Sequence, residues 1–555
     1  MHNLNILSLV GLALCRIASA ASGEEWATRT IYQVMTDRFA RTDGSTTATC
    51  DTGVGDYCGG TWQGLIGHLD YIQGMGFDAV WISPVTEQLE GLTADGAAYH
   101  GYWQTDLNAV NSHFGSASDL QSLSAALHSR GMYLMIDVVV NHFAALGPPD
   151  SVDYSSLQPF NSQDYYHSYC SINFNNLADI VSISQKSQHL HCRDYHSGRR
   201  CLLAGSHVQL QTATLTNVLQ TQVEQCWMGS QNVPLPDLRT EDSGVASTLN
   251  NWISGLVSDY SIDGLRIDSA MEVHPNFWAA FQTAAGVYSL GEVYVADSDF
   301  VCGYQDYLPG VLNYAMYYPM TAAFSSTTGS MGDLANMIDT IKSCPDASQL
   351  GTFSENHDIT RFASLNGDMA LAKNVLTFTM LTDGIPVVYQ GQEQHYNAQG
   401  GSGSEGSPYP WNREAVWLSG YNTDAELYVL TKQLNAARHV AITNDGNYVT
   451  TQNEHIYAEL HTMAMKKGDL LTIVTNDGSS GAAWTLSVPL AFTADTPVTE
   501  VLTCETLTTA SDGTLAVPMS GGLPRVYYPT ALLTSCGDGG ATTKRKMKRA
   551  VEFNA

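Results

Sequence analysis

The stretch Ser261-Ile262-Asp263-Gly264-Leu265-Arg266-Ile267-Asp268 decides how the chain folds. Its apolar residues predict a short buried strand that ends on an arginine and a carboxylate. Burying such charges is unfavourable unless they pair, and residues two apart on a strand point to the same face. We therefore expect Arg266 and Asp268 to pair. This stretch alone leaves open whether the pair is a structural ion pair or part of a reactive site.

Apolar strand-like runs alternate with helical stretches on both sides of this strand, which is the pattern of a parallel α/β fold. We predict eight strands, at residues 30–39, 77–85, 132–140, 261–268, 287–292, 310–313, 351–358 and 385–390. Eight such strands predict a (β/α)₈ TIM barrel, in which functional residues lie at the C-terminal ends of strands. Asn141, Asp268, Glu292 and Asp358 all fall at such ends, which favours a reactive site.

Changes in composition divide the chain into domains. An apolar core followed by Ala18-Ser19-Ala20 predicts a cleavable secretory signal. Residues 143–237 are too rich in Ser, Asp, Gln and Tyr to continue the alternation, and short β-like runs with Asp-Gly turns begin near 443. The predicted domains are a signal peptide (1–20), the barrel (21–142 and 238–442), an inserted irregular domain (143–237), a C-terminal antiparallel β-sandwich (443–536) and a disordered basic tail (537–555).

Composition excludes several classes of partner. The formal net charge of −29 argues against nucleic acids and anionic membranes, because both attract basic surfaces. No run of about 20 apolar residues predicts a membrane span. Eleven cysteines in a chain with a secretory signal indicate disulfides and an extracellular protein, with cell-wall association left open. We expect a secreted monomer that acts on an uncharged substrate.

Three carboxylates that meet at one barrel mouth suit the cleavage of glycosidic bonds, which needs a nucleophile or base and an acid. The aromatic run Tyr99-His100-Gly101-Tyr102-Trp103 either packs in the core or offers a flat face to a sugar ring. Sequence gives no separation between the carboxylates, so retention and inversion of configuration stay open at this point.

Several segments together carry a resemblance to a known family. They are Asp137-Val138-Val139-Val140-Asn141-His142, Leu235-Pro236-Asp237-Leu238, Gly264-Leu265-Arg266-Ile267-Asp268, Gly291-Glu292-Val293 and Phe353-Ser354-Glu355-Asn356-His357-Asp358. In this order they resemble the fungal secreted α-amylases of the Taka-amylase type, within the α-amylase family of glycoside hydrolases. The resemblance covers roughly residues 22–536 apart from one segment.

The resemblance implies an endo-acting, retaining α-1,4-glucan hydrolase that acts on starch or related α-glucans. It implies Asp268 as nucleophile, Glu292 as general acid/base and Asp358 as stabiliser of the transition state. The implied substrate-binding residues are Tyr102, Trp103, His142, Arg266, His357 and Arg413.

The resemblance also implies a Ca²⁺ site that joins the barrel to the inserted domain. Its ligands would be Asn141, Glu224, Asp237 and the main-chain carbonyl of Glu272, and oxygen ligands from separate segments suit this ion. The implied disulfides are Cys50–Cys58, Cys170–Cys226, Cys302–Cys344 and Cys504–Cys536.

Two departures from the family pattern stand out. Taka-type enzymes carry Lys-His at the third and fourth positions after the nucleophile, where this chain has Met271 and Glu272. The change raises the hypothesis of a cell-wall 4-α-glucanotransferase on the same scaffold. A third reading, a non-catalytic glucan-binding protein, is opposed by the complete set of catalytic residues.

The second departure is the segment 181–220, which has no counterpart in the family and contains Cys192 and Cys201. We hypothesise that it is a translated intron; the alternative is a surface loop closed by a disulfide between these two cysteines. A transcript that lacks these codons would decide for the intron.

Overall fold

The computed structural model describes residues 21–172, 223–398, 409–533 and 535–536. The predicted signal peptide, the atypical segment 181–220 and the basic tail lie outside the described residues.

Eight parallel strands form one sheet in the order β10-β9-β8-β5-β2-β1-β12-β11. A parallel bridge between Leu312, directly after β10, and Gly351 on β11 joins the two edges. The sheet therefore closes into a barrel, and the predicted fold class is confirmed. The bounds are β1 Ile31–Val34, β2 Ala79–Ile82, β5 Tyr133–Val138, β8 Gly264–Ile267, β9 Tyr288–Gly291, β10 Gly310–Val311, β11 Gly351–Thr352 and β12 Ile385–Tyr389.

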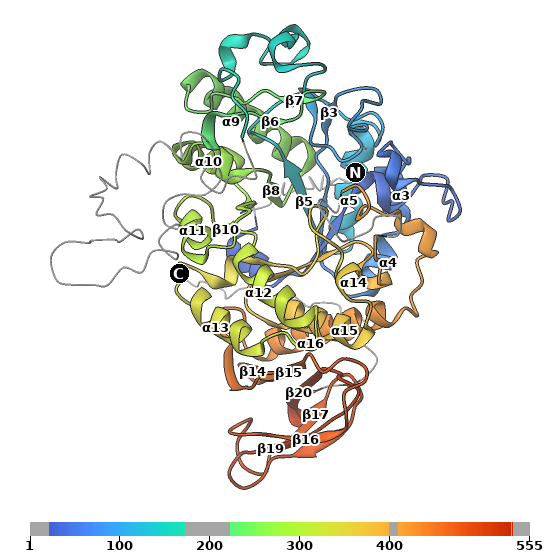
Figure 1. Ribbon diagram of the computed structural model, residues 1–555, viewed down its shortest axis with the longest axis vertical. Helices are drawn as coiled ribbons and strands as arrows, with labels where there is room; N and C mark the ends of the chain where they lie inside the picture. Colours follow the sequence, from blue (N-terminus) through green and yellow to red (C-terminus); the bar gives the residue numbers. More distant parts are fainter. Residues whose placement is uncertain (1–20, 173–222, 399–408, 534, 537–555) are drawn as a thin grey trace, which may run out of the picture.

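Helices surround this barrel (Figure 1). In α9 the buried residues Val245, Leu249, Ile253 and Leu256 recur every three or four positions, so one apolar face packs inward. The helices around the barrel are α1 Gly23–Ala27, α2 Thr36–Phe39, α3 Trp62–Gly67, α4 Leu69–Gly74, α5 Ala117–Ser129, α9 Ser243–Tyr260, α10 Trp278–Ala285, α11 Ser298–Gly303, α12 Tyr314–Phe324, α13 Met331–Ile341, α14 Phe362–Leu365, α15 Met369–Leu381 and α16 Glu426–Asn444.

The strands are shorter than predicted, and the first shows why. We expected a strand over 30–39, but β1 ends at Val34 and Thr36–Phe39 is the helix α2. The turn places Asp37 and Arg38 as a buried ion pair, 2.8 Å apart. The Asp37 carboxylate also accepts main-chain hydrogen bonds from Cys58 and Gly59. A continuing strand could not bring these buried charges to their partners.

A small β domain follows α16 at the end of the molecule opposite the hairpin β6–β7 (Figure 1). Its main sheet has six strands in the order β13-β14-β15-β20-β17-β18, and β16 pairs with β19. Lys467 of β14 forms a buried ion pair with Asp383, which precedes β12 of the barrel, and so links the two domains. The bounds are β13 Glu454–Ala458, β14 Thr462–Lys467, β15 Leu470–Thr475, β16 Trp484–Val488, β17 Pro497–Glu500, β18 Thr506–Thr508, β19 Leu515–Met519 and β20 Arg525–Pro529.

Two small hairpins rise above the barrel next to each other (Figure 1). One consists of β3 Thr86–Gln88 and β4 Gln104–Val110, and the other of β6 Met228–Gly229 and β7 Pro234–Leu235. The four disulfides implied by the resemblance are all present. Among the described residues, no helix has the length and apolar character needed to cross a membrane.

Candidate active site

One arginine organises the candidate active site. Arg266 on β8 is 1% exposed, and its Nη1 donates to Asp268 Oδ1 at 2.9 Å. Its Nη2 contacts Glu292 Oε1 at 2.8 Å. The predicted pairing of Arg266 with Asp268 is confirmed, and the same guanidinium also holds Glu292. Two carboxylates from the ends of neighbouring strands thus share one cation.

A third carboxylate, Asp137 on β5, was missing from the predicted site. Arg266 Nη1 donates to both of its oxygens, at 2.9 and 3.0 Å, and Tyr102 Oη donates to Oδ2 at 2.8 Å. The sequence did contain a signal, because a carboxylate in the middle of a buried apolar strand needs a cationic partner. Burial raises the pKa of Asp137 to about 7, although Arg266 opposes this shift.

The two carboxylates at the strand ends are held differently. Asp268 Oδ2 accepts a hydrogen bond from Ser269 Oγ at 2.9 Å, and Glu292 Oε2 accepts one from Ser269 N at 2.9 Å. Burial raises the pKa of Glu292 to about 8, the Arg266 cation lowers it, and the negative charges of Asp268 and Asp358 raise it. Glu292 can therefore hold a proton near neutral pH, as a general acid needs. The neighbouring Asp268 is held by different contacts, so the two carboxyl groups lie in different environments.

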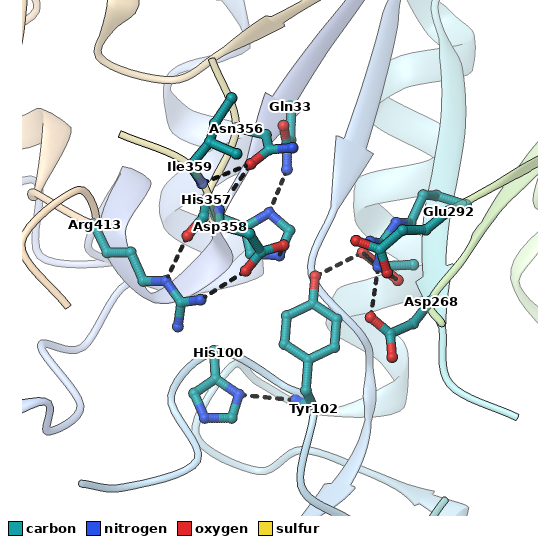
Figure 2. A network of polar contacts seen from close by, with 12 residues as sticks. Gln33, His100, Tyr102, Asp268, Glu292, Asn356, His357, Asp358, Ile359 and Arg413 are labelled. Carbon is teal, nitrogen blue, oxygen red and sulfur yellow. Dashed lines mark hydrogen bonds and ion pairs between the residues drawn. The ribbon is translucent and has the colours of Figure 1, made fainter. Parts of the chain in front are cut away.

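Asp358 lies across the site, between two basic side chains (Figure 2). Arg413 Nη2 contacts its Oδ1 at 3.1 Å and His357 Nε2 contacts its Oδ2 at 3.0 Å. Gln33 Nε2 lies 2.7 Å from His357 Nδ1, and donation to that nitrogen places the imidazole proton on Nε2. Burial lowers the pKa of His357 well below its ordinary value, so this imidazole is neutral.

These side chains surround a cavity of about 440 Å³. The Tyr102 ring lies parallel to the His357 ring with centroids 5.3 Å apart, so the aromatic run contributes to the site as well as to the core. His142 Nε2 lies 3.2 Å from the Tyr102 carbonyl oxygen. Eight predicted residues line the cavity: Tyr102, Trp103, His142, Asp268, Glu292, His357, Asp358 and Arg413. Asp95, Ser230 and Tyr409 also line it and were not predicted.

The residues implied for calcium lie away from the cavity lining. Leu238 N donates to Asn141 O at 2.8 Å, and His142 pairs with Asp237 in an antiparallel bridge. This pairing brings buried Asn141 and Asp237 together. Asp237 Oδ1 is buried without a well-formed hydrogen bond, whereas Oδ2 lies 2.7 Å from His167 Nδ1.

This donor set fits a calcium ion. Asp237 Oδ1 is a buried carboxylate oxygen without a well-formed hydrogen bond, and it lies beside the buried amide of Asn141. A hard cation such as Ca²⁺ prefers oxygen ligands of this kind. Glu224 and Glu272 are also buried. The described residues contain no cluster of three or more acidic, histidine or cysteine side chains placed for a metal. A calcium site here therefore also needs the side-chain amide of Asn141 and the main-chain carbonyl of Glu272 as ligands.

The two residues that depart from the family pattern do not line the cavity. Met271 is 3% exposed and packs in the main hydrophobic core, and Glu272 is 8% exposed in a short 3₁₀ turn. One aromatic side chain that the sequence analysis did not single out follows Glu292 closely in the chain. Tyr294, two residues after Glu292, is 43% exposed and stacks on Tyr314 with ring centroids 4.3 Å apart.

Comparisons with known proteins agree with this geometry. The family model "Alpha amylase, catalytic domain" matches residues 33–441, and the model "Alpha-amylase, domain C" matches residues 455–546. The chain is 46% identical over 527 residues to Alpha-amylase 2 of Schwanniomyces occidentalis, covering 94% of each chain. It is 44% identical to an Alpha-amylase of Saccharomycopsis fibuligera, covering 92% of each. The solved structure of an α-amylase from Malbranchea cinnamomea is 47% identical, with a TM-score of 0.82 over 93% of this chain and 99% of that one.

Proposed function

Because this chain belongs to the α-amylase family of glycoside hydrolases, we propose that it is an endo-acting α-amylase that cleaves α-1,4-glucans with retention of configuration. The observation that carries the proposal is the sharing of Arg266 by Asp268 and Glu292 at the mouth of the barrel. Adjacent nitrogens of one planar guanidinium hold the two carboxylates close together. This favours the short separation of a retaining pair over the wider one that inversion needs.

In the proposed mechanism, Asp268 attacks the anomeric carbon while Glu292 protonates the glycosidic oxygen of the leaving chain. Arg266 orients the Asp268 carboxylate through their 2.9 Å ion pair. The raised pKa of Glu292 supports its role as the acid. After the leaving chain departs, ionised Glu292 takes a proton from water, which hydrolyses the glycosyl ester on Asp268.

Other residues of the cavity would bind the sugar ring at the point of cleavage. Tyr102 offers its ring face, and neutral His142 and His357 can exchange hydrogen bonds with hydroxyls. Asp358 lies where its negative charge can stabilise the positive charge that develops on the sugar. Arg413 positions Asp358 through their 3.1 Å contact.

Incubating the protein with maltoheptaose and Ca²⁺ tests this function. We expect only shorter maltooligosaccharides by mass spectrometry, and NMR of the first products should show the α-anomer. Both outcomes follow from the covalent intermediate and its capture by water. Initial products of β configuration would contradict the retaining mechanism. No turnover at all would favour the glucan-binding interpretation.

The transferase remains a second candidate, and one observation favours it. The exposed Tyr294 ring is stacked on Tyr314 and follows Glu292, the proposed acid, by two residues. Aromatic faces bind sugar rings, so this ring could hold an acceptor glucan in place of water. Products longer than seven units in the same incubation would establish transfer. The buried positions of Met271 and Glu272 give it no further support.

We also propose that Ca²⁺ occupies a site formed by Asn141 and Asp237, with Glu224 and the Glu272 carbonyl as further ligands. The proposal is supported by Asp237 Oδ1, which is buried without a well-formed hydrogen bond. The ion would fix the inserted segment to the end of β5 and so keep His142, next to Asn141, in the cavity.

Chelation of calcium should lower the thermal midpoint of unfolding, and added Ca²⁺ should restore it. A ligand present at a hundred times its Kd stabilises a folded protein by about 2.7 kcal/mol. Asp237→Asn should unfold at the lower midpoint and respond little to Ca²⁺ or chelator. Asp242→Asn, a partly exposed residue directly before α9, is the matched control. A wild-type midpoint that chelator leaves unchanged would rule the site out.

Disulfides and the acidic composition fit an extracellular protein. We infer that the chain is secreted and acts as a monomer on starch-like polysaccharides or maltooligosaccharides.

A further inference from the structure

A belt of polar contacts joins three separate segments around one end of the cavity. We define this belt as Tyr409, Asp95, Ser230 and Asn232. Tyr409 Oη donates to the Asp95 carbonyl oxygen at 3.4 Å. The Asp95 carboxylate accepts hydrogen bonds from Ser230 Oγ and, at 3.0 Å, from Asn232 Nδ2. Tyr409, Asp95 and Ser230 all line the cavity.

Through Tyr409 the belt contacts Arg413, and the proposed mechanism places the glycone, the part of the glucan retained on the enzyme, on the side of Arg413. The Arg413 guanidinium lies over the Tyr409 ring, 4.3 Å from its centroid. Figure 2 shows Arg413 and Glu292 on opposite sides of Tyr102. Because the acid protonates the leaving oxygen, the leaving chain extends on the side of Glu292. The retained chain therefore extends toward Arg413 and the belt.

Both halves of the belt are held in place before any substrate binds. Ser230 Oγ accepts hydrogen bonds from the main-chain N–H groups of Asn232 and Val233, at 2.9 and 3.1 Å. Both of its acceptor positions are then in use, and its single proton is directed to Asp95.

Asp95 belongs to a tight turn, in which Thr93 N donates to Gly96 O at 2.9 Å. Gly96 has φ +100, and a Cβ there would lie 2.8 Å from the Gly55 carbonyl oxygen. The turn is thereby packed against a neighbouring loop and carries Asp95 at its tip.

We propose that Asp95 determines substrate length specificity, because it connects the turn at 93–96 to the hairpin β6–β7 and thereby limits the glycone that the site accepts. This inference rests on the proposed α-glucan hydrolase function. A long polymer that lies across the site needs an open groove on both sides of the bond that is cleaved. On the glycone side, the belt connects the turn at 93–96 to the hairpin β6–β7 and so crosses this groove. Short glycones fit inside the belt, whereas longer glycones enter only when the exposed contacts of Asp95 open. The enzyme is then still endo-acting, but it cleaves bonds deep inside a chain more slowly than bonds near the non-reducing end.

The test measures which bond of maltoheptaose, labelled at its reducing end, is cleaved, together with kcat/KM for maltoheptaose and for amylose. In the wild-type protein we expect cleavage mostly near the non-reducing end. In Asp95→Ala the cleaved bonds should move toward the reducing end. The ratio of kcat/KM for amylose to that for maltoheptaose should rise about three- to tenfold, the size expected when one or two exposed hydrogen bonds are lost.

Ser230→Ala removes the same contact from the other side and should shift cleavage in the same direction. The double variant should shift it little further, because the two residues act through one contact. Glu90→Gln, an exposed carboxylate paired with His113 outside the cavity, should cleave as the wild type does. Unchanged cleavage patterns in active Asp95→Ala and Ser230→Ala would overturn the inference and leave the proposed function standing. An inactive wild-type protein would instead overturn both.

Discussion

Glu292→Gln is expected to lower kcat/KM for maltoheptaose by about 10²–10⁴-fold, the usual contribution of a positioned general acid. Glutamine keeps the size of the side chain and can still contact Ser269 N, which donates to Glu292 Oε2 at 2.9 Å. It has no proton to give to the glycosidic oxygen. Activity should therefore fall without loss of fold, and circular dichroism with thermal unfolding checks the fold.

The same variant tests the titration of Glu292. Its pKa is raised to about 8 mainly by burial, so wild-type kcat/KM should fall as pH rises through about 8 and the acid loses its proton. Glu292→Gln should lack this alkaline limb. With an α-maltosyl fluoride, whose leaving group needs no protonation, the first step should survive and azide should accelerate the second. An alkaline limb that persists in the variant would assign it to another group.

Arg266→Met is expected to lower the free energy of unfolding by about 3–5 kcal/mol near neutral pH, the cost of removing one partner from a buried ion pair. The change leaves Asp137, Asp268 and Glu292 buried without their common cation. Urea unfolding at several pH values measures the effect. Arg130→Met, whose partner Asp70 is exposed, should change stability by about 0–1 kcal/mol and serves as the control.

The pH dependence of the Arg266→Met variant has a definite sign. Burial already raises the folded-state pKa of Asp137 and Glu292 in the wild type, and removing the Arg266 cation, which lowers both, raises them further. The folded state then binds more protons than the unfolded state, so stability falls as pH rises. The deficit relative to the wild type should shrink at pH 5 and grow at pH 8. A deficit independent of pH would mean that lost packing, and not uncompensated charge, is responsible.

The barrel and the carboxylates that we propose for catalysis were predictable from local patterns. Apolar runs that end on Asp268, Glu292 and Asp358 reflect two physical requirements, burial of the strands and pairing of the charges at their ends. The pairing of Arg266 with Asp268 followed from the two-residue repeat of a strand. Asp137 carried the same kind of signal, since a carboxylate within an apolar strand demands a cation.

Other features required the tertiary structure, because the groups that meet are far apart in the chain and ordinary in themselves. Nothing local to Asp95, an acidic residue in a surface turn, indicates that Ser230 and Asn232 will reach it. The end of β1 at Val34 depends on partners of Asp37 that follow some twenty residues later. The burial of Met271 likewise depends on packing against the core. Sequence by itself determined the strands and their charged ends, because hydrophobic periodicity and the cost of desolvating a charge act locally. The tertiary structure decided how the loops around the cavity are joined, because those contacts link loops whose sequences are independent of each other.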